Sequence, residues 1–200
     1  MLPDVRTLAE TVAGRVIAAA DELTDLDSAI GDGDHGLNMK RGFAAVLEDL
    51  PAVAEKPLPE ALQSIGMKLL MKVGGASGPL YGTLIMTLGK ELPAEPSAAE
   101  AARAFTAAVL ALKTRGKADI GQKTMLDVLE PVAGALAAGE LRLPVIRSMA
   151  RECATATIAM RAGRGRASFL GERSIGHMDP GARSAQLMIE AVCDALEART

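Results

Sequence analysis

Eight stretches of this chain repeat apolar residues at the spacing of an α-helix, and short turns separate them. In residues 4–23, for example, Val5, Leu8 and Val12 fall on one helical face. Further helices are predicted over about 37–49, 59–72, 80–92, 97–113, 124–138, 144–162 and from Pro180 onward. The apolar residues, 49% of the chain, are mostly Ala, Leu, Val, Ile and Met, with only 2% aromatic residues. This composition favours helices over sheets.

Local signals mark several of the helix ends. Ser97 followed by Glu100 forms a capping box before the fifth helix. Asp179 and Pro180 suit the cap and first position of the last helix, and Pro51 should end the second. Short turns make neighbouring helices antiparallel, so we predict an all-α fold. The chain would be either an eight-helix up-and-down bundle or a closed helical barrel, formed as a single domain over residues 1–200.

The charge and cysteine content exclude several classes of protein. A net charge of −3 provides no overall basic field for nucleic acid. The chain has no run of about 18 apolar residues and no signal-like N-terminus, so no membrane partner is expected. Cys153 and Cys193 have no metal-ligand spacing, and we expect reduced thiols. These features are typical of a cytoplasmic protein.

The most acidic turn follows the first predicted helix, at Leu26–Asn38. Asp27, Asp32 and Asp34 place three carboxylates within eight residues, and glycines lie among them. Because a helix does not tolerate this density of glycine, we predict a loop over the whole stretch. A solvated acidic turn is the simpler alternative, since Asp and Gly are the commonest turn residues. Three carboxylates together favour a hard cation such as Mg²⁺ or Ca²⁺, although the spacing does not fit an EF-hand.

Two further loops have unusual compositions. Residues 73–83 are rich in Gly without a P-loop ending, so they form either a plain turn or a phosphate-binding backbone. Residues 163–178 form a long loop that is either a solvated basic face or a contact for phosphate or a partner. The loop contains Arg164, Arg166 and Arg173, and Arg161 lies just before it. These loops follow the first, third and seventh helices, so up-and-down topology predicts one composite site at a single rim. The start of the second helix would attract an anion there.

The chain resembles the nucleotide-binding L subunit of dihydroxyacetone kinases, which is also the C-terminal domain of single-chain dihydroxyacetone kinases. The resemblance covers the whole chain and rests on four motifs in order. They are Ile30-Gly31-Asp32-Gly33-Asp34-His35-Gly36-Leu37-Asn38, Gly74-Gly75-Ala76-Ser77-Gly78-Pro79-Leu80-Tyr81-Gly82-Thr83, Lys123-Thr124-Met125-Leu126-Asp127 and Gly165-Arg166-Ala167-Ser168, the last followed by Gly171-Glu172-Arg173-Ser174-Ile175-Gly176-His177.

The resemblance implies an eight-helix antiparallel barrel with a nucleotide site at one rim. It implies that Asp27, Asp32 and Asp34 bind two Mg²⁺ ions, which hold the phosphates of ADP or ATP. The implied nucleotide contacts are His35, Gly36, Leu37, Asn38, Ala76, Ser77, Gly116, Met125, Arg166, Asp179, Pro180 and Gly181. Dihydroxyacetone would be bound covalently by a histidine of a separate K-type subunit. His35 and His177 are therefore expected to be positioning or structural residues.

The implied function is that of a kinase subunit that is active only with its partner. Phosphoryl transfer needs mainly charge neutralisation and in-line positioning, so no general base is expected in this chain. The favoured version is phosphotransferase-dependent, in which a phosphocarrier M-type subunit recharges bound ADP. The alternatives are an ATP-dependent kinase subunit for dihydroxyacetone or another short sugar, and a non-catalytic nucleotide-binding signalling module. A homodimer is left open.

Overall fold

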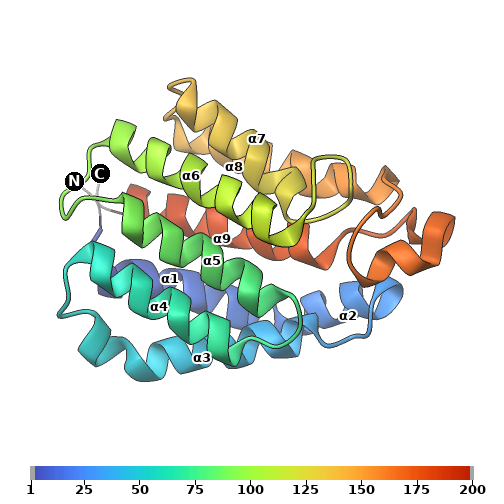
Figure 1. Ribbon diagram of the computed structural model, residues 1–200, viewed down its shortest axis with the longest axis horizontal. Coiled ribbons are helices and arrows are strands. Elements are labelled where there is room, and N and C mark those ends of the chain that lie inside the picture. Colours follow the sequence, from blue (N-terminus) through green and yellow to red (C-terminus); the bar gives the residue numbers. More distant parts are fainter. Residues whose placement is uncertain (1–2, 199–200) are drawn as a thin grey trace.

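The computed structural model describes residues 3–198, so the first and last two residues of the predicted domain lie outside it. Within that range the chain forms nine α-helices and two 3₁₀ helices and no strand (Figure 1). The elements are α1 (Val5–Ala18), α2 (Ala20–Ile30), α3 (His35–Val53), α4 (Leu58–Lys72), α5 (Ser77–Glu91), α6 (Ala98–Gly116), α7 (Leu126–Ala137), α8 (Leu143–Ala156), η1 (Thr157–Ala159), η2 (Arg166–Ser174) and α9 (Pro180–Glu197).

Eight of these helices form a closed ring. Helix α1 packs against α3, each helix from α3 to α8 packs against the next, and α9 returns to α1. Helix α2 lies outside this ring and packs against α3, α9 and η2 at one end of the molecule. The predicted barrel of eight antiparallel helices is therefore confirmed, with α2 added at its rim.

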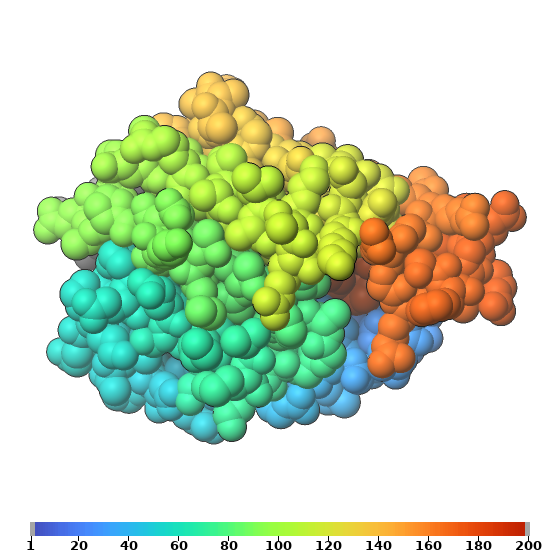
Figure 2. Space-filling model, in the orientation of Figure 1, coloured from blue at the N-terminus to red at the C-terminus, as the bar shows by residue number. Residues whose placement is uncertain are grey.

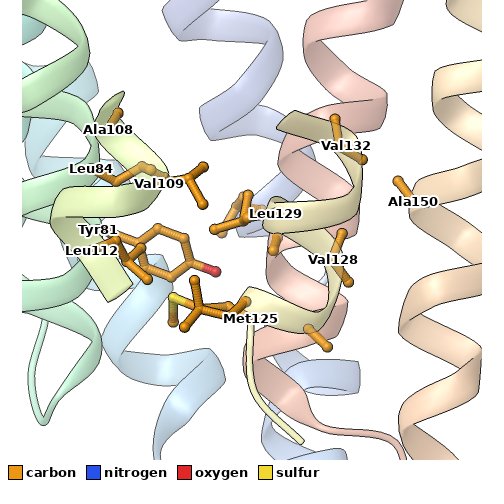
Figure 3. Close-up of a cluster of buried hydrophobic side chains, with 14 of the residues drawn as sticks. Tyr81, Leu84, Ala108, Val109, Leu112, Met125, Val128, Leu129, Val132 and Ala150 are labelled. Carbon is orange, nitrogen blue, oxygen red and sulfur yellow. The ribbon is translucent and has the colours of Figure 1, made fainter. Parts of the chain in front are cut away.

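The interior of the ring is filled by apolar side chains. Leu129 of α7 points toward Tyr81 of α5 and Val109 of α6, whereas Val132 lies on the side of α7 that faces α8 (Figure 3). All four are at most 3% exposed. Burying such a side chain contributes about 1.5–3 kcal/mol, so the core rather than the loops holds the barrel together.

The first two predicted helices differ from those in the structure. The helix predicted over residues 4–23 is broken at Ala19 into α1 and α2, and α2 continues to Ile30. Helix α3 begins at His35 and runs through Pro51, which was predicted to end it. Pro51 lies in the last turn of α3, where it removes one backbone donor while the next turn still closes from Ala54 N to Leu50 O.

Several other predicted helix ends need smaller changes. Helix α5 begins at Ser77, three residues before the predicted start at Leu80, and α8 ends at Ala156 instead of residue 162. The predicted capping box is present, because Ser97 N donates to Glu100 Oε2 at 2.8 Å and Ser97 Oγ accepts from Glu100 N. Asp179 caps α9 by accepting a hydrogen bond from Ala182 N at 2.7 Å.

Helix α9 carries a stripe of polar residues, which are Arg183, Gln186, Glu190, Asp194 and Glu197. In the structure this stripe faces α1, α2 and α8 through ion pairs. Arg151 of α8 lies 2.8 Å from Glu190, Arg147 lies 2.7 Å from Asp194, and Arg183 lies 2.7 Å from Glu22 of α2. These pairs join α9 to α8, its neighbour in the ring, and to α2, which lies outside the ring.

Both cysteines are free thiols, as expected. Burial raises the pKa of the Cys193 thiol to about 11 and also raises the pKa of the Cys153 thiol, so both stay protonated at neutral pH. Among residues 3–198, no helix is long and apolar enough to cross a membrane.

Helices α4 and α5 approach each other closely at glycines. A Cβ on Gly82 would lie 2.9 Å from Leu70 Cβ and 3.0 Å from the Gly66 carbonyl oxygen. The Gly82→Ala substitution is therefore expected to lower the free energy of unfolding by about 1–3 kcal/mol, because the two helices must move apart. Gly134 in α7 is a matched control, since its Cβ would meet nothing within 4 Å. Gly134→Ala should stabilise the fold by about 0.5–1 kcal/mol. Urea denaturation distinguishes the two outcomes, and equal losses would contradict the crowding argument.

Candidate functional site

A cavity of about 490 Å³ opens at the rim where α2 lies. Figure 2 shows the surface hollowed between the orange segment that contains η2 and the end of α6. Most of the predicted site residues line this cavity: Asp27, Asp32, Asp34, His35, Asn38, Ala76, Ser77, Gly116, Met125, Arg166, Asp179, Pro180 and Gly181. The acidic, glycine-rich and arginine-rich loops thus meet at one rim, as the topology predicted.

The lining does not include two of the predicted contacts, Gly36 and Leu37. The Leu37 side chain is 57% exposed on the outside of α3. Gly36 faces α2, and a Cβ there would lie 1.9 Å from the Ala20 carbonyl oxygen. Gly36 is therefore needed for close packing of α2 on α3, and its role as a nucleotide contact stays a prediction.

The three predicted metal ligands lie together. One carboxylate oxygen from each of Asp27, Asp32 and Asp34 is within 4.8 Å of the others. The loop in the structure is shorter than the one predicted over Leu26–Asn38. Asp27 belongs to the last turn of α2, and only residues 31–34 lie between α2 and α3. The glycines begin only at Gly31, so the helix can extend to Ile30.

Asp27 also shapes the turn that carries the other two carboxylates. It is 8% exposed, and its Oδ2 accepts hydrogen bonds from Asp34 N at 2.9 Å and His35 N at 3.1 Å. A Cβ on Gly31 would lie 2.0 Å from Asp27 Oδ1. Gly31 therefore provides space for the carboxylate, and Gly33 provides a positive φ of 73°.

One cation of the protein approaches this acidic cluster. Arg166 Nη2 lies 2.9 Å from Asp32 Oδ2, and both side chains remain partly exposed. One guanidinium cannot balance three carboxylates, so the cluster keeps a net negative charge. Oxygen ligands that converge in this way fit Mg²⁺ or Ca²⁺, and the cluster contains no thiol or imidazole that would favour Zn²⁺.

Four helices, α3, α5, α7 and α9, begin at the cavity, and their N-termini provide backbone N–H groups. The cap residues of α3 and α5, Asp34 and Ala76, make no side-chain capping hydrogen bond. The first N–H groups of α5 thus lack a side-chain acceptor, next to a lining that includes Gly74 and Gly75. Unpaired N–H groups and the positive end of a helix dipole suit a phosphate group.

His35 connects two of these helix starts beneath the cavity. Its Nδ1 lies 3.1 Å from Ser77 Oγ and its Nε2 lies 3.0 Å from Ser184 Oγ. Ser184 Oγ also lies 2.7 Å from the Tyr81 hydroxyl and donates to the Gly181 carbonyl oxygen. Burial lowers the pKa of the His35 imidazole, although Asp27 and Asp34 oppose that shift. The ring is thus held between α5 and α9 through both of its nitrogens, and its expected positioning or structural role stays a prediction.

The sequence did not identify two buried charged residues at the cavity, Lys123 in its lining and Asp127 in the first turn of α7. Lys123 is 1% exposed and Asp127 is 4% exposed. Asp127 accepts hydrogen bonds from Gly121 N at 2.6 Å and Thr124 N at 2.7 Å, which fixes the loop after α6. The polar residues at the beginning of the segment Gly121–Asp127 could have indicated a functional loop. They do not reveal which backbone groups the side chains of Lys123 and Asp127 contact.

Asp179 has an unusual environment at the start of α9. Burial raises the pKa of its carboxyl from 3.8 to about 7, and the carboxylates of Asp127 and Asp27 add to this shift. The hydrogen bond from Ala182 N and the charge of Lys123 act in the opposite direction. Because the folded pKa is the higher one, the ligand-free protein loses stability as pH rises from about 4 to about 7.

The Asp179→Asn substitution tests this pH dependence. Asparagine can still cap α9 but carries no charge, so the variant should exceed the parent chain in free energy of unfolding at pH 8. We expect a difference of at least about 1 kcal/mol that disappears near pH 4. Denaturation with urea, without Mg²⁺ or nucleotide, measures it. Equal stability at pH 8 would contradict the raised pKa, and Asp179→Ala shows the separate cost of losing the cap.

A closed ring of eight helices with an acidic, glycine-rich cavity at one rim places this chain among all-α ligand-binding domains. Residues 29–194 match the family model described as the DAK2 domain. The chain therefore belongs to the DAK2-domain family, and the resemblance inferred from its motifs is confirmed.

The relatives include separate subunits and longer chains. The chain is 45% identical over 190 residues to the PEP-dependent dihydroxyacetone kinase, ADP-binding subunit DhaL, of Escherichia coli K12, with 90% of each chain covered. It is 36% identical over 174 residues to the PTS-dependent dihydroxyacetone kinase, ADP-binding subunit DhaL, of Lactococcus lactis, with 87% of each covered. It is 33% identical over 196 residues to human triokinase/FMN cyclase, covering 94% of this chain but 34% of that protein.

A solved structure shares the fold. The crystal structure of the dihydroxyacetone kinase from C. freundii in complex with AMP-PNP and Mg²⁺ matches with a TM-score of 0.80 and 24% identity. The match covers 95% of this chain and 33% of that one, so the chain corresponds to about a third of the larger kinase.

Proposed function

We propose that this chain is the ADP-binding subunit of a dihydroxyacetone kinase and that residues 1–200 form one nucleotide-binding domain. The observation that carries the proposal is the rim cavity, where three carboxylates lie beside the starts of α3 and α5. The chain that carries this cavity is 45% identical to the ADP-binding subunit of such a kinase. The chain would act together with a kinase partner that holds the sugar.

The acidic cluster would hold the metal. We assign Asp27, Asp32 and Asp34 as ligands of Mg²⁺, and of two ions as the family resemblance implies. With Arg166 the three carboxylates keep a net charge that one Mg²⁺ balances, and the phosphates of the nucleotide would balance the second ion. When bound, Mg²⁺ neutralises charge on the phosphate oxygens of the nucleotide. The chain orients Asp27 through its hydrogen bonds from Asp34 N and His35 N, so this ligand is fixed in advance.

The remaining lining would hold ADP. Backbone N–H groups at the start of α5 are placed to donate to phosphate oxygens, and Arg166 can add a charged donor. Leu80, Leu112 and Met125 provide an apolar part of the lining on which a purine ring could pack. The cavity volume of about 490 Å³ lies in the range of ordinary ligand sites.

The partner would be a K-type subunit that presents dihydroxyacetone, and recharging of ADP would use an M-type phosphocarrier. Two observations support this version over exchange of ATP. The relatives named as PEP-dependent or PTS-dependent ADP-binding subunits match this chain at 45% and 36% identity. The identity to the Escherichia coli subunit, 45%, exceeds the 33% identity to human triokinase/FMN cyclase.

A reconstituted assay tests the proposal. The chain is mixed with a K-type subunit and dihydroxyacetone, and receives either ATP alone or ADP with a phosphorylated carrier. Dihydroxyacetone phosphate should form in the carrier reaction and not with ATP alone. Turnover with ATP alone would overturn the carrier version, and turnover with neither donor would overturn the kinase proposal and favour a signalling module.

A further inference from the structure

Lys123 is a fully buried cation in an unusual backbone conformation. It is 1% exposed, and its φ of 60° lies in the left-handed region that non-glycine residues rarely adopt. Its Nζ donates to the carbonyl oxygens of Thr157 at 2.6 Å and Met160 at 3.2 Å and to that of His177. An ammonium has three N–H donors, so these carbonyls use all of them.

The three carbonyls belong to the two ends of one segment. We name residues 160–178 the arginine lobe, since it carries Arg161, Arg164, Arg166 and Arg173. Met160 begins the lobe and Thr157 lies just before it, whereas His177 lies at its end, two residues before the cap of α9. A single ammonium therefore joins the loop after α6 to both ends of the lobe.

Two backbone hydrogen bonds close the same base. Gly176 N donates to the Ile158 carbonyl oxygen at 2.8 Å, and Gly163 N donates to the Gln122 carbonyl oxygen at 3.0 Å. Asp127 fixes the loop that carries Lys123 through its own two hydrogen bonds. The base of the lobe is thus held by the loop after α6 and by η1.

The outer part of the lobe has few contacts with the barrel. Ala162 and Ala167, with Leu170, pack on Ile30 of α2, and Arg166 pairs with Asp32. Phe169 is 89% exposed. A segment with a small apolar contact depends on its base for its orientation.

We propose that Lys123 is a positioning residue for the nucleotide site. Because its ammonium joins both ends of the arginine lobe, it determines the positions of Arg166 and of the start of α9 relative to the cavity. This inference rests on the proposed function, because the ligand of the site is taken to be Mg·ADP. A purely packing role would need only the aliphatic part of the side chain, whereas positioning needs the three N–H donors.

The Lys123→Met substitution separates these two roles, because methionine keeps most of the volume and removes the donors. Isothermal titration with Mg·ADP should show a dissociation constant increased by about tenfold or more, the order expected when a charged hydrogen-bonding group is lost. Lys117→Met is the matched control, since Lys117 has a φ of 47° in the same loop but is exposed. Its dissociation constant should stay within about twofold of the parent value.

A double-substitution cycle shows whether Lys123 acts through the lobe. In the Arg166→Ala background, Lys123→Met should weaken Mg·ADP binding by clearly less than in the parent background, because the residue to be positioned is gone. Additive losses would overturn positioning through Arg166. If Lys123→Met loses its thermal transition and therefore does not fold, Lys123→Gln replaces it. The glutamine amide keeps two N–H donors for the carbonyls of Thr157, Met160 and His177.

Limited trypsin digestion tests the fixing of the lobe without any nucleotide. Trypsin cleaves after arginine, so Lys123→Met should be cut at Arg164, Arg166 or Arg173 about tenfold faster than the parent chain and Lys117→Met. Unchanged cleavage together with unchanged affinity would overturn the inference. If the parent chain does not bind Mg·ADP, the proposed function fails, and the digestion still shows whether Lys123 fixes the lobe.

Discussion

Adding Mg·ADP at a thousandfold excess over its dissociation constant is expected to raise the free energy of unfolding by about 4 kcal/mol. The cavity is built from segments that are far apart in the sequence, including residues 27–38, 74–77 and 179–181. The unfolded chain therefore has no equivalent site, and all of the binding free energy acts on the folded state. For a chain of 200 residues, this corresponds to a rise in melting temperature of about 8–16 °C.

Thermal unfolding followed by circular dichroism measures this rise. ADP with a chelator is the control, because the carboxylate cluster should not hold the phosphates without a cation. A melting temperature that does not respond to ADP and Mg²⁺ together would contradict the proposed site, whatever the partner subunit does.

Loss of one carboxylate should have the largest effect on binding. The Asp32→Asn substitution is expected to weaken binding of Mg·ADP by at least the ten- to hundredfold that loss of a supporting group typically costs at a metal site. Helix content should not change, because Asp32 is an exposed residue between α2 and α3. Asp25→Asn is the matched control, since Asp25 is exposed on α2 and does not line the cavity. Equal affinities for Mg·ADP in the two variants would refute the metal assignment.

A second variant weakens the same site without removing a charge. Gly31→Ala places a methyl group where the Asp27 carboxylate lies, since a Cβ there would be 2.0 Å from Asp27 Oδ1. Affinity for Mg·ADP should therefore fall although all three carboxylates remain. Normal affinity would mean that Asp27 can move aside and still bind the metal. The hydrogen bonds that Asp27 accepts from Asp34 N and His35 N argue against that outcome.

The sequence predicted an antiparallel set of helices because each helix buries one apolar face, and this periodicity is local. The pattern left a bundle and a closed ring open, and only the family resemblance implied the ring. The sequence also predicted that three loops meet at one rim, because that follows from alternating helix direction. It did not predict the break at Ala19, where neither Gly nor Pro marks the turn. This break lets α2 lie on the start of α3, a contact that depends on Gly36 and is visible only in three dimensions.

The parts of the site that sequence reasoning missed depend on backbone carbonyls and buried hydroxyls. Lys123 reads as an ordinary surface lysine until the carbonyls of Thr157 and His177 are placed beside it. Ser184 lies within an unremarkable helix, yet its hydroxyl contacts both His35 and Tyr81. Such contacts join residues more than 30 positions apart, so no local pattern reports them.

The antiparallel pairing of α9 with α1 and α2 determines how this domain can be joined to other molecules. Arg15 lies 3.6 Å from Glu190 and Arg183 lies 2.7 Å from Glu22, so the chain runs back along its own beginning. The start of α1 and the end of α9 therefore lie side by side, at the end of the barrel away from α2 and the cavity (Figure 1). A tag, a surface tether or a neighbouring domain attached at either end would leave the mouth of the cavity accessible to a large substrate-bearing protein.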